Sequence, residues 1–163
     1  MRTLILALAT LVTLVAPAKA SAKATSCAGF LERSSPIDVN RFYATRAIDI
    51  VRAGLDGDKK SLDVLVSPIA RFELWRGDTG TGRQGGVAGA IEMARNLAPT
   101  RFQTVSDRPG PISISPVKCE WTTFLLLRTQ QPNTGINVRF KFVDGLLLEA
   151  VGHEVDLYEG DVR

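Results

Sequence analysis

A glycine-rich stretch carries the most conspicuous chemical motif of this chain. Gly80 to Gly85 reads Gly-Thr-Gly-Arg-Gln-Gly, the glycine spacing of a dinucleotide-binding fingerprint, and Asp107 follows about where an acid would bind a ribose. The strand expected before this motif ends at Trp75, several residues too early, and no further strand–helix–strand unit follows. Arg83 and Gln84 also replace the lysine and hydroxyl residue of a phosphate-binding loop. We therefore expect no nucleotide, and no cofactor of any other kind.

General acid–base chemistry has few candidate residues. His153 is the only histidine, so it alone could act as a base near neutral pH without a shifted pKa. No nucleophile-elbow motif accompanies it. Glu149 and Glu154 would project from opposite faces of one strand, which excludes a carboxylate pair. Strand parity predicts that His153 lies on the outer face of a sheet, as a surface or dimer-face residue, together with Leu147, Glu149, Val151 and Val155.

The first residues read as a cleavable secretory signal peptide. Arg2 precedes an apolar run from Leu4 to Ala16, which at roughly 13 residues is shorter than the ~20 that cross a bilayer as a helix. Small residues favour cleavage after Ala20, with Ala24 as the alternative. A lipidated Cys27 is disfavoured because no large aliphatic residue lies three places before it. We expect a periplasmic or secreted protein with a signal peptide at 1–20, an N-terminal extension at 21–35 and one domain at 36–163.

Removal of this leader leaves almost no net positive charge. The chain has 20 lysines and arginines against 17 aspartates and glutamates, but Arg2 and Lys19 leave with the leader, so 18 basic residues remain against 17 acidic ones. Nucleic acids and anionic membranes bind through accumulated basic charge. We therefore expect neither a nucleic-acid partner nor stable membrane insertion after cleavage.

Cys27 and Cys119 are the two cysteines of the chain. In an oxidising compartment a disulfide between them is the expected state, and two separate thiols are the alternative. One histidine and two distant cysteines do not supply the ligand cluster of a metal site, so none is expected.

Three helices are predicted in the first part of the domain. Ser35 is suited to cap the first one, with Pro36 at its first position and Asp38 in its first turn, and Gly54 is expected to end it. Asp58 would cap a shorter helix that stops by Pro68. Residues 87–97 form the third, after a mobile loop over 77–86.

Strands are predicted around and after the third helix. The first, 69–75, alternates Ala70, Phe72 and Leu74 on one face with polar residues on the other. The later ones cover 102–106, 112–115, 119–128, 136–143 and 146–157, and Asp144-Gly145 is a two-residue hairpin signal. These elements predict an α+β domain with its helices on one face of a curved antiparallel sheet.

The order of these motifs resembles the nuclear transport factor 2-like superfamily, which includes SnoaL-like polyketide cyclases and ketosteroid isomerases. Gly57-Asp58 leads through Pro68 to Ala70-Arg71-Phe72-Glu73, and 140–147 reads as the last hairpin. The resemblance covers roughly residues 36–156. It implies a cone-shaped, cystatin-like α+β roll that encloses a pocket and often dimerises through its convex sheet face.

The catalytic residues of ketosteroid isomerases are not present at the corresponding positions of this sequence. In an ungapped count the catalytic tyrosine of that family falls at Ile50, its general-base aspartate at Leu74 and its second aspartate at Val138. Proton abstraction needs a base and an oxyanion donor, and apolar side chains provide neither.

The same register predicts an inward-facing, mostly apolar set with one phenol, Tyr43, and one acid, Glu154. The remaining members are Phe72, Leu74, Val138, Phe140, Phe142, Ala150 and Gly152. Such residues suit a site for a small apolar ligand, for which we single out Tyr43, Phe72, Leu74, Val138, Phe140 and Glu154, or they simply fill the core. We expect a non-catalytic ligand-binding or interaction module, with a homodimer through the outer sheet face. The alternative is a SnoaL-like or ketosteroid-isomerase-like enzyme, an isomerase, cyclase or dehydratase, that uses Tyr43 and Glu154 on a hydrophobic ring.

Overall fold

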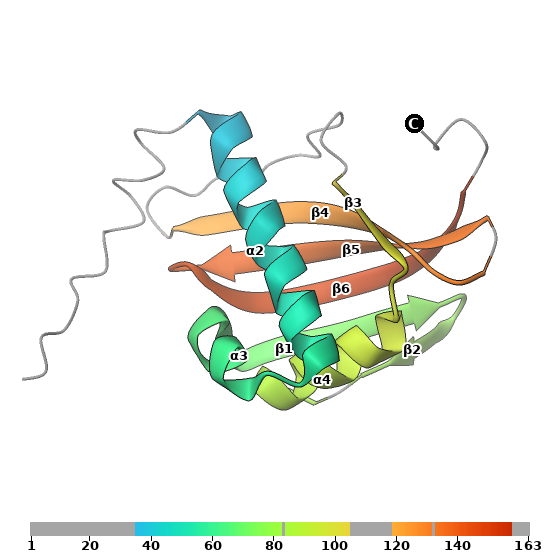
Figure 1. Cartoon of the computed structure of the whole chain (residues 1–163), viewed down its shortest axis with the longest axis horizontal. Helices are drawn as coiled ribbons and strands as arrows, with labels where there is room; N and C mark the ends of the chain where they lie inside the picture. The colour runs from blue at the N-terminus through green and yellow to red at the C-terminus, as the bar shows by residue number, and fades with distance from the viewer. Residues whose placement is uncertain (1–34, 83, 105–118, 132, 158–163) are drawn as a thin grey trace, which may run out of the picture.

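The computed structural model places three helices on one face of a single curved sheet (Figure 1). It describes residues 35–82, 84–104, 119–131 and 133–157. The predicted signal peptide, Cys27, Asp107 and the strand expected at 112–115 lie outside these residues. Within them the sheet has six strands in the order β2-β1-β6-β5-β4-β3.

Helix α2 (Pro36–Asp56) begins as its sequence predicts, because the Ser35 hydroxyl accepts the Asp38 amide proton at 3.2 Å. The predicted end at Gly54 is wrong. Gly57 ends the helix in the left-handed conformation, with φ of 69°. Gly54 instead lies where α2 crosses α4, and a Cβ there would come within 2.6 Å of the Ala94 Cβ. It is a packing glycine rather than a helix terminator.

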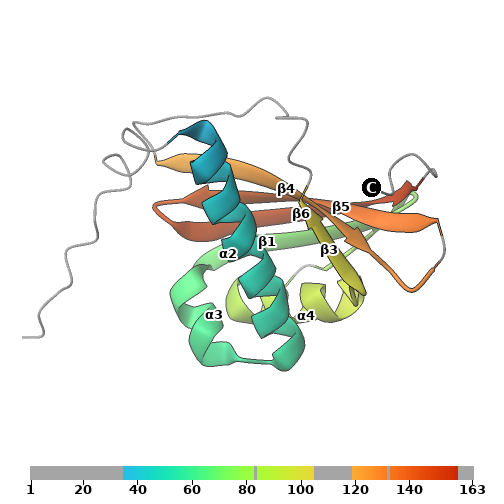
Figure 2. The same cartoon turned by 45° about the horizontal axis from the view of Figure 1, so that its top comes forward.

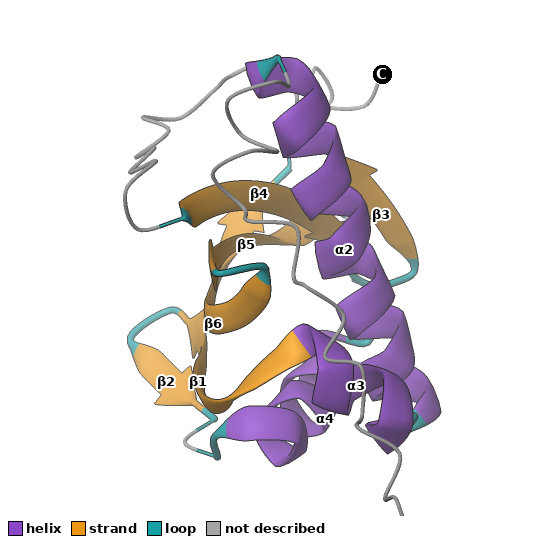
Figure 3. Cartoon of the chain, turned by 90° about the vertical axis from the view of Figure 1, so that its left-hand side faces the viewer, coloured by secondary structure: helices purple, strands orange, loops and turns teal. Residues whose placement is uncertain are grey.

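Two shorter helices complete the layer seen from the side in Figure 3. Helix α3 (Lys59–Leu65) is capped by Asp58, which accepts the Ser61 amide proton. Helix α4 (Gly86–Leu97) ends at Ala98, immediately before Pro99. All three helix starts agree with the sequence to within one residue.

Strand β1 (Val66–Arg76) begins directly after α3 and includes Pro68, so it starts earlier than predicted. The predicted alternation is confirmed, since Ala70, Phe72 and Leu74 are buried. The stretch predicted as a loop contains a strand, β2 (Thr79–Thr81), which pairs antiparallel with β1. Because a hairpin rather than a strand–helix crossover holds Gly80 to Gly82, the geometry of a dinucleotide fingerprint is absent there.

The remaining strands are β3 (Arg101–Thr104), β4 (Glu120–Arg128), β5 (Thr134–Val143) and β6 (Leu146–Asp156), which pair as an antiparallel meander. Asp144 and Gly145 both have positive φ, 49° and 80°, as a type I′ hairpin turn requires. The sheet is mixed rather than wholly antiparallel, because β6 pairs parallel to β1. This pair joins the first strand to the last.

One predicted side-chain orientation is wrong. Leu147 was expected on the outer face with Val151 and Val155, but it is fully buried and pairs with Phe142. The register shifts between Phe142–Leu147 and Lys141–Glu149, so β6 carries an extra residue, Leu148. Such a bulge reverses the alternation on one side of it, which strand parity cannot reveal. Figure 2 shows the resulting curved sheet with the helices on its concave side.

Candidate ligand-binding site

The inner face of the sheet brings together most of the residues predicted to line a pocket. The register aligns Phe140 with Ala150 and Phe72 in one row, and Val138 with Gly152 and Leu74 in the next. All of these residues, together with Phe142 and Tyr43, are buried. The predicted geometry is thus present, and its use in binding a ligand stays a prediction.

The positions that correspond to ketosteroid isomerase chemistry lie in the apolar interior. Ile50 on α2, Leu74 on β1 and Val138 on β5 are each at most 2% exposed and belong to one hydrophobic cluster. An acid at any of them would be desolvated among apolar neighbours, and these side chains offer no proton to transfer.

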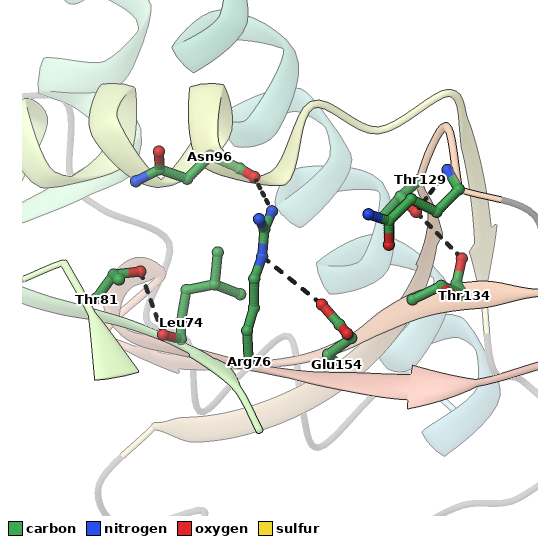
Figure 4. A network of polar contacts seen from close by, with 8 residues as sticks. Leu74, Arg76, Thr81, Asn96, Thr129, Thr134 and Glu154 are labelled. Atoms are coloured by element: carbon green, nitrogen blue, oxygen red, sulfur yellow. Dashed lines mark hydrogen bonds and ion pairs between the residues drawn. The ribbon is translucent and has the colours of Figure 1, made fainter. Parts of the chain in front are cut away.

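Glu154 occupies the rim of this face. It lies opposite Ile136 in the sheet, and its Oε2 atom is 3.7 Å from Nε of Arg76. Arg76 also donates a hydrogen bond of 2.9 Å to the carbonyl oxygen of Asn96 at the end of α4 (Figure 4). With side-chain exposures of 54% and 36%, the Arg76–Glu154 pair links helix and sheet from a solvated position.

Tyr43 and Glu154 are not brought together. The Tyr43 ring packs 4.8 Å from that of Phe142, whereas Glu154 pairs with Ile136 at the other end of β5. Six residues of strand separate these two partners, about 20 Å at ~3.3 Å per residue. An acid and a base that act on one proton-transfer step must both reach the reacting atoms. Tyr43 and Glu154 could meet only across a long substrate.

The end of the inner face near Tyr43 holds a cluster that the sequence analysis missed. Trp121 on β4 is 1% exposed, and its ring lies nearly parallel to that of Tyr43, with centroids 6.0 Å apart. Nε1 of Trp121 is buried and has no hydrogen-bond partner in the part of the chain that the structure describes. Thr123, on the same face, donates a hydrogen bond of 2.9 Å to Oδ1 of Asn40 on α2. We call Asn40, Tyr43, Trp121, Thr123 and Phe142 the aromatic end of the roll.

A sequence signal for this cluster did exist. Residues 121, 123, 125 and 127 are buried and alternate with half-buried ones in the strand before the last hairpin. Once β4 is aligned with β5, Trp121 pairs with Phe142 and Thr123 with Phe140, which places both on the predicted inner face.

His153 lies on the outer face, as predicted, and its ring is nearly parallel to that of Trp75, with centroids 6.4 Å apart. On the same face Glu149 forms an ion pair with Arg139. The Cys119 side chain is half-buried. Because Cys27 lies outside the described residues, the disulfide stays a prediction.

Four hollows with described linings share no residue with the aromatic end. One of about 420 Å³ runs between β1 and the segment after β2, with Trp75 and Gly80 in its lining. A second, of about 780 Å³, lies between α3 and α4 beside Val87 and Ile91. The third, of about 430 Å³, is formed where β4 turns into β5. The fourth, of about 280 Å³, is on the outer sheet face around Asn137.

Two further observations apply to the part of the chain that the structure describes. No three histidine, cysteine, aspartate or glutamate side chains gather there in a way that could hold a metal ion. No helix in that part combines the length and the apolar character needed to cross a membrane.

No family model and no curated protein matches the sequence. Solved structures with similar architecture include a protein described as Rd1NTF2_04 with long sheet, at TM-score 0.46 and 15% identity over 69% of this chain and 98% of that one. An NTF2-like protein from Shewanella baltica OS155 has TM-score 0.45 and 14% identity over 75% and 98%. One from Burkholderia xenovorans LB400 has TM-score 0.44 and 14% identity over 74% and 88%.

The arrangement of the elements settles the fold class. Two helices precede a β1–β2 hairpin, a third helix follows, and a meander returns its last strand to the side of the first. In fold, the chain is therefore the cone-shaped α+β roll that its sequence resemblance to the nuclear transport factor 2-like superfamily implies.

Proposed function

We propose that this chain is an exported domain that binds a small, largely apolar molecule at the aromatic end of its roll, without converting it. The observation that carries the proposal is the indole N–H of Trp121, a buried donor with no acceptor among the described residues. Native proteins leave few buried polar groups unpaired, and each such donor costs about 1–3 kcal/mol. A ligand that places an oxygen there would recover this free energy.

The surroundings of Trp121 support the same ligand class. Tyr43 and Phe142 provide aromatic faces on either side of the helix–sheet interface, with centroid distances to each other of 4.8 Å. Thr123 is the one buried polar side chain of the described core, and it already pairs with Asn40. Apolar walls with a few placed polar groups are typical of sites for small hydrophobic molecules. We therefore expect a cyclic, mostly hydrocarbon ligand with one acceptor oxygen.

Binding is favoured over catalysis because of the placement of Tyr43 and Glu154. They lie at opposite ends of the inner face, and Glu154 is held at the rim by Arg76. Enzymatic proton transfer in this roll would need a pair of groups within reach of one atom.

The test compares 1-tetralone with its parent hydrocarbon tetralin, which lacks the acceptor oxygen. We expect wild type to bind the ketone about fivefold more tightly, the value of one net hydrogen bond of ~1 kcal/mol. Trp121→Phe should bind both compounds equally, because phenylalanine keeps an aromatic ring and loses the donor. Trp75→Phe, on the outer face, is the matched control and should retain the preference.

Calorimetric or NMR titration measures both affinities. A ketone preference that persists in Trp121→Phe would contradict the role of the indole. Absence of binding of either compound to wild type at millimolar concentration would contradict the proposed apolar site, and turnover of an enolisable ketone would favour the enzyme.

We further propose that two copies pair through the outer face of the sheet. No helix covers this face among the described residues (Figure 3), and Phe124, Val151 and Val155 line a hollow there of about 280 Å³. Oδ1 of Asn137 in the same hollow is buried and accepts no hydrogen bond from a described residue. Apolar residues grouped on a surface indicate an interface, and a symmetric dimer would apply the same patch from each copy.

Sedimentation analysis of wild type and Val151→Asp tests this assembly. A dimer that dissociates in the variant is expected, because the carboxylate would be buried without a partner. A monomeric wild type at 100 micromolar would contradict the proposal.

The proposal also includes export with cleavage of the signal peptide and a disulfide between Cys27 and Cys119. The mature protein should begin after Ala20 or Ala24, which N-terminal sequencing of the exported form decides. Reduction should raise its mass by two hydrogen atoms if Cys27 and Cys119 are joined. An unchanged mass would indicate two separate thiols.

A further inference from the structure

A polar hollow of about 430 Å³ lies where β3 begins and β4 turns into β5. Its lining includes Thr100, Arg128, Gln130, Gln131, Asn133 and Thr134, and Arg128 is the one charged residue among the described residues that line it. We infer that this hollow binds a small polyhydroxylated carboxylate, of which a sugar acid is the simplest example. The site is separate from the aromatic end, and the inference does not depend on the proposed function.

Arg128 supplies the anion-recognising group. Its Nε atom is shielded from solvent and makes no hydrogen bond, although the residue as a whole is partly exposed. None of the ion pairs among the described residues involves it. A guanidinium group presents a planar set of donors that matches a carboxylate in two parallel hydrogen bonds. Within the described part of the chain, the buried Nε donor of Arg128 therefore lacks an acceptor.

The backbone around Arg128 is held in place before any ligand arrives. Thr100 donates from its amide to the Arg128 carbonyl oxygen at 2.8 Å and from its hydroxyl to the same oxygen at 3.1 Å. Thr129 donates its hydroxyl to the Thr134 carbonyl oxygen at 3.3 Å and accepts the Gln131 amide proton at 3.2 Å, which Figure 4 shows in part. These bonds hold the backbone on either side of the turn, so they reduce the backbone ordering that would oppose binding.

The amide side chains around the hollow indicate hydroxyl groups on the ligand. Gln130, Gln131 and Asn133 each carry a donor and an acceptor, as a sugar hydroxyl does. All three are exposed at the rim rather than buried in the core. A ligand with one carboxylate and several hydroxyls satisfies Arg128 and this rim together.

Calorimetric titration of the full protein with D-glucuronate, D-glucose, acetate and inorganic phosphate tests the inference. We expect glucuronate to bind at least tenfold more tightly than any of the other three, and its binding to weaken at high salt. Arg128→Gln should lose this binding, whereas Arg41→Gln, which removes an exposed arginine on α2, should not. Gln130→Ala should lower the affinity for glucuronate several-fold and leave that for acetate unchanged.

Circular dichroism confirms that each variant is folded. Glucuronate bound equally by Arg128→Gln and wild type would overturn the assignment of Arg128. Glucose bound as tightly as glucuronate would overturn the requirement for a carboxylate. Phosphate or acetate bound as tightly as glucuronate would overturn the sugar-acid class, and no binding of glucuronate at ten millimolar would overturn the site itself.

Discussion

Replacement of Gly54 by alanine tests the packing of the helical layer. Helix propensity and steric overlap act in opposite directions, and together they decide whether the free energy of unfolding rises or falls. In an exposed helix interior, alanine is more favourable than glycine by about 1 kcal/mol. At this position the new Cβ would lie 2.6 Å from the Ala94 Cβ and 2.9 Å from the Ala90 carbonyl oxygen. Carbon atoms in contact normally lie ~3.5–4.0 Å apart, so α2 and α4 would have to separate by roughly 1 Å.

The steric term should exceed the helix-propensity term. An added methyl group in a packed core costs about 1–3 kcal/mol, and the upper end applies because the backbone of α4 cannot rotate away. The net expectation for Gly54→Ala is a loss of about 1–2 kcal/mol in the free energy of unfolding. For a domain of this size such a loss lowers Tm by roughly 3–8 °C.

Urea denaturation followed by circular dichroism measures the change. Ala94→Gly removes the closest colliding atom, so Gly54→Ala should be less harmful in that background, by about 1 kcal/mol in a double-mutant cycle. Ala88→Gly, at an exposed position of α4, reports the helix-propensity term alone. A Gly54→Ala protein as stable as wild type or more stable would refute the close crossing of α2 and α4.

Two further predictions concern the bulge and the α3 cap. Leu147→Ala should lower the free energy of unfolding by about 2–5 kcal/mol because Leu147 is fully buried. Leu148 is half-buried, so Leu148→Ala should cause a clearly smaller loss. Equal losses of the two variants in urea denaturation would contradict the bulge. The pKa of Asp58 is lowered from 3.8 chiefly by the hydrogen bond from the Ser61 hydroxyl, with help from the Ser61 amide. Because the folded-state pKa is the lower one, this cap stabilises the fold above pH ~4 and its contribution falls as the pH drops through the folded-state pKa. The stability difference between wild type and Asp58→Ala should therefore shrink below pH 4, and a difference that is constant from pH 2 to 6 would contradict the role of the carboxylate.

The local signals in the sequence were sufficient for most element boundaries. Ser35 and Asp58 cap helices with their own side chains, and the Asp144-Gly145 turn depends on the φ angles of two adjacent residues. The inner face of β1 followed from strict alternation. These features involve residues a few positions apart, so the chain specifies them without reference to the rest of the fold.

The sequence predicted which residues of the candidate site face inward, but not which of them meet across the sheet. Tyr43, Phe72, Leu74, Val138 and Phe140 could be assigned to the inner face from alternation and helical spacing. The meeting of Trp121 with Tyr43, and the separation of Tyr43 from Glu154, depend on which strands are neighbours and in what register. A sequence with no partner strand assigned does not contain that information.

Periodicity and capping by themselves determined an α+β domain with an apolar inner face, and the family resemblance added that apolar Ile50, Leu74 and Val138 stand where a ketosteroid isomerase has its tyrosine and two aspartates. Tertiary structure alone decided the rest. Gly54 stays helical because α4 packs against it, and Leu147 turns inward because the neighbouring strand requires a bulge. Packing of distant segments overrides a local preference worth about 1 kcal/mol, since burying one large apolar side chain is worth more.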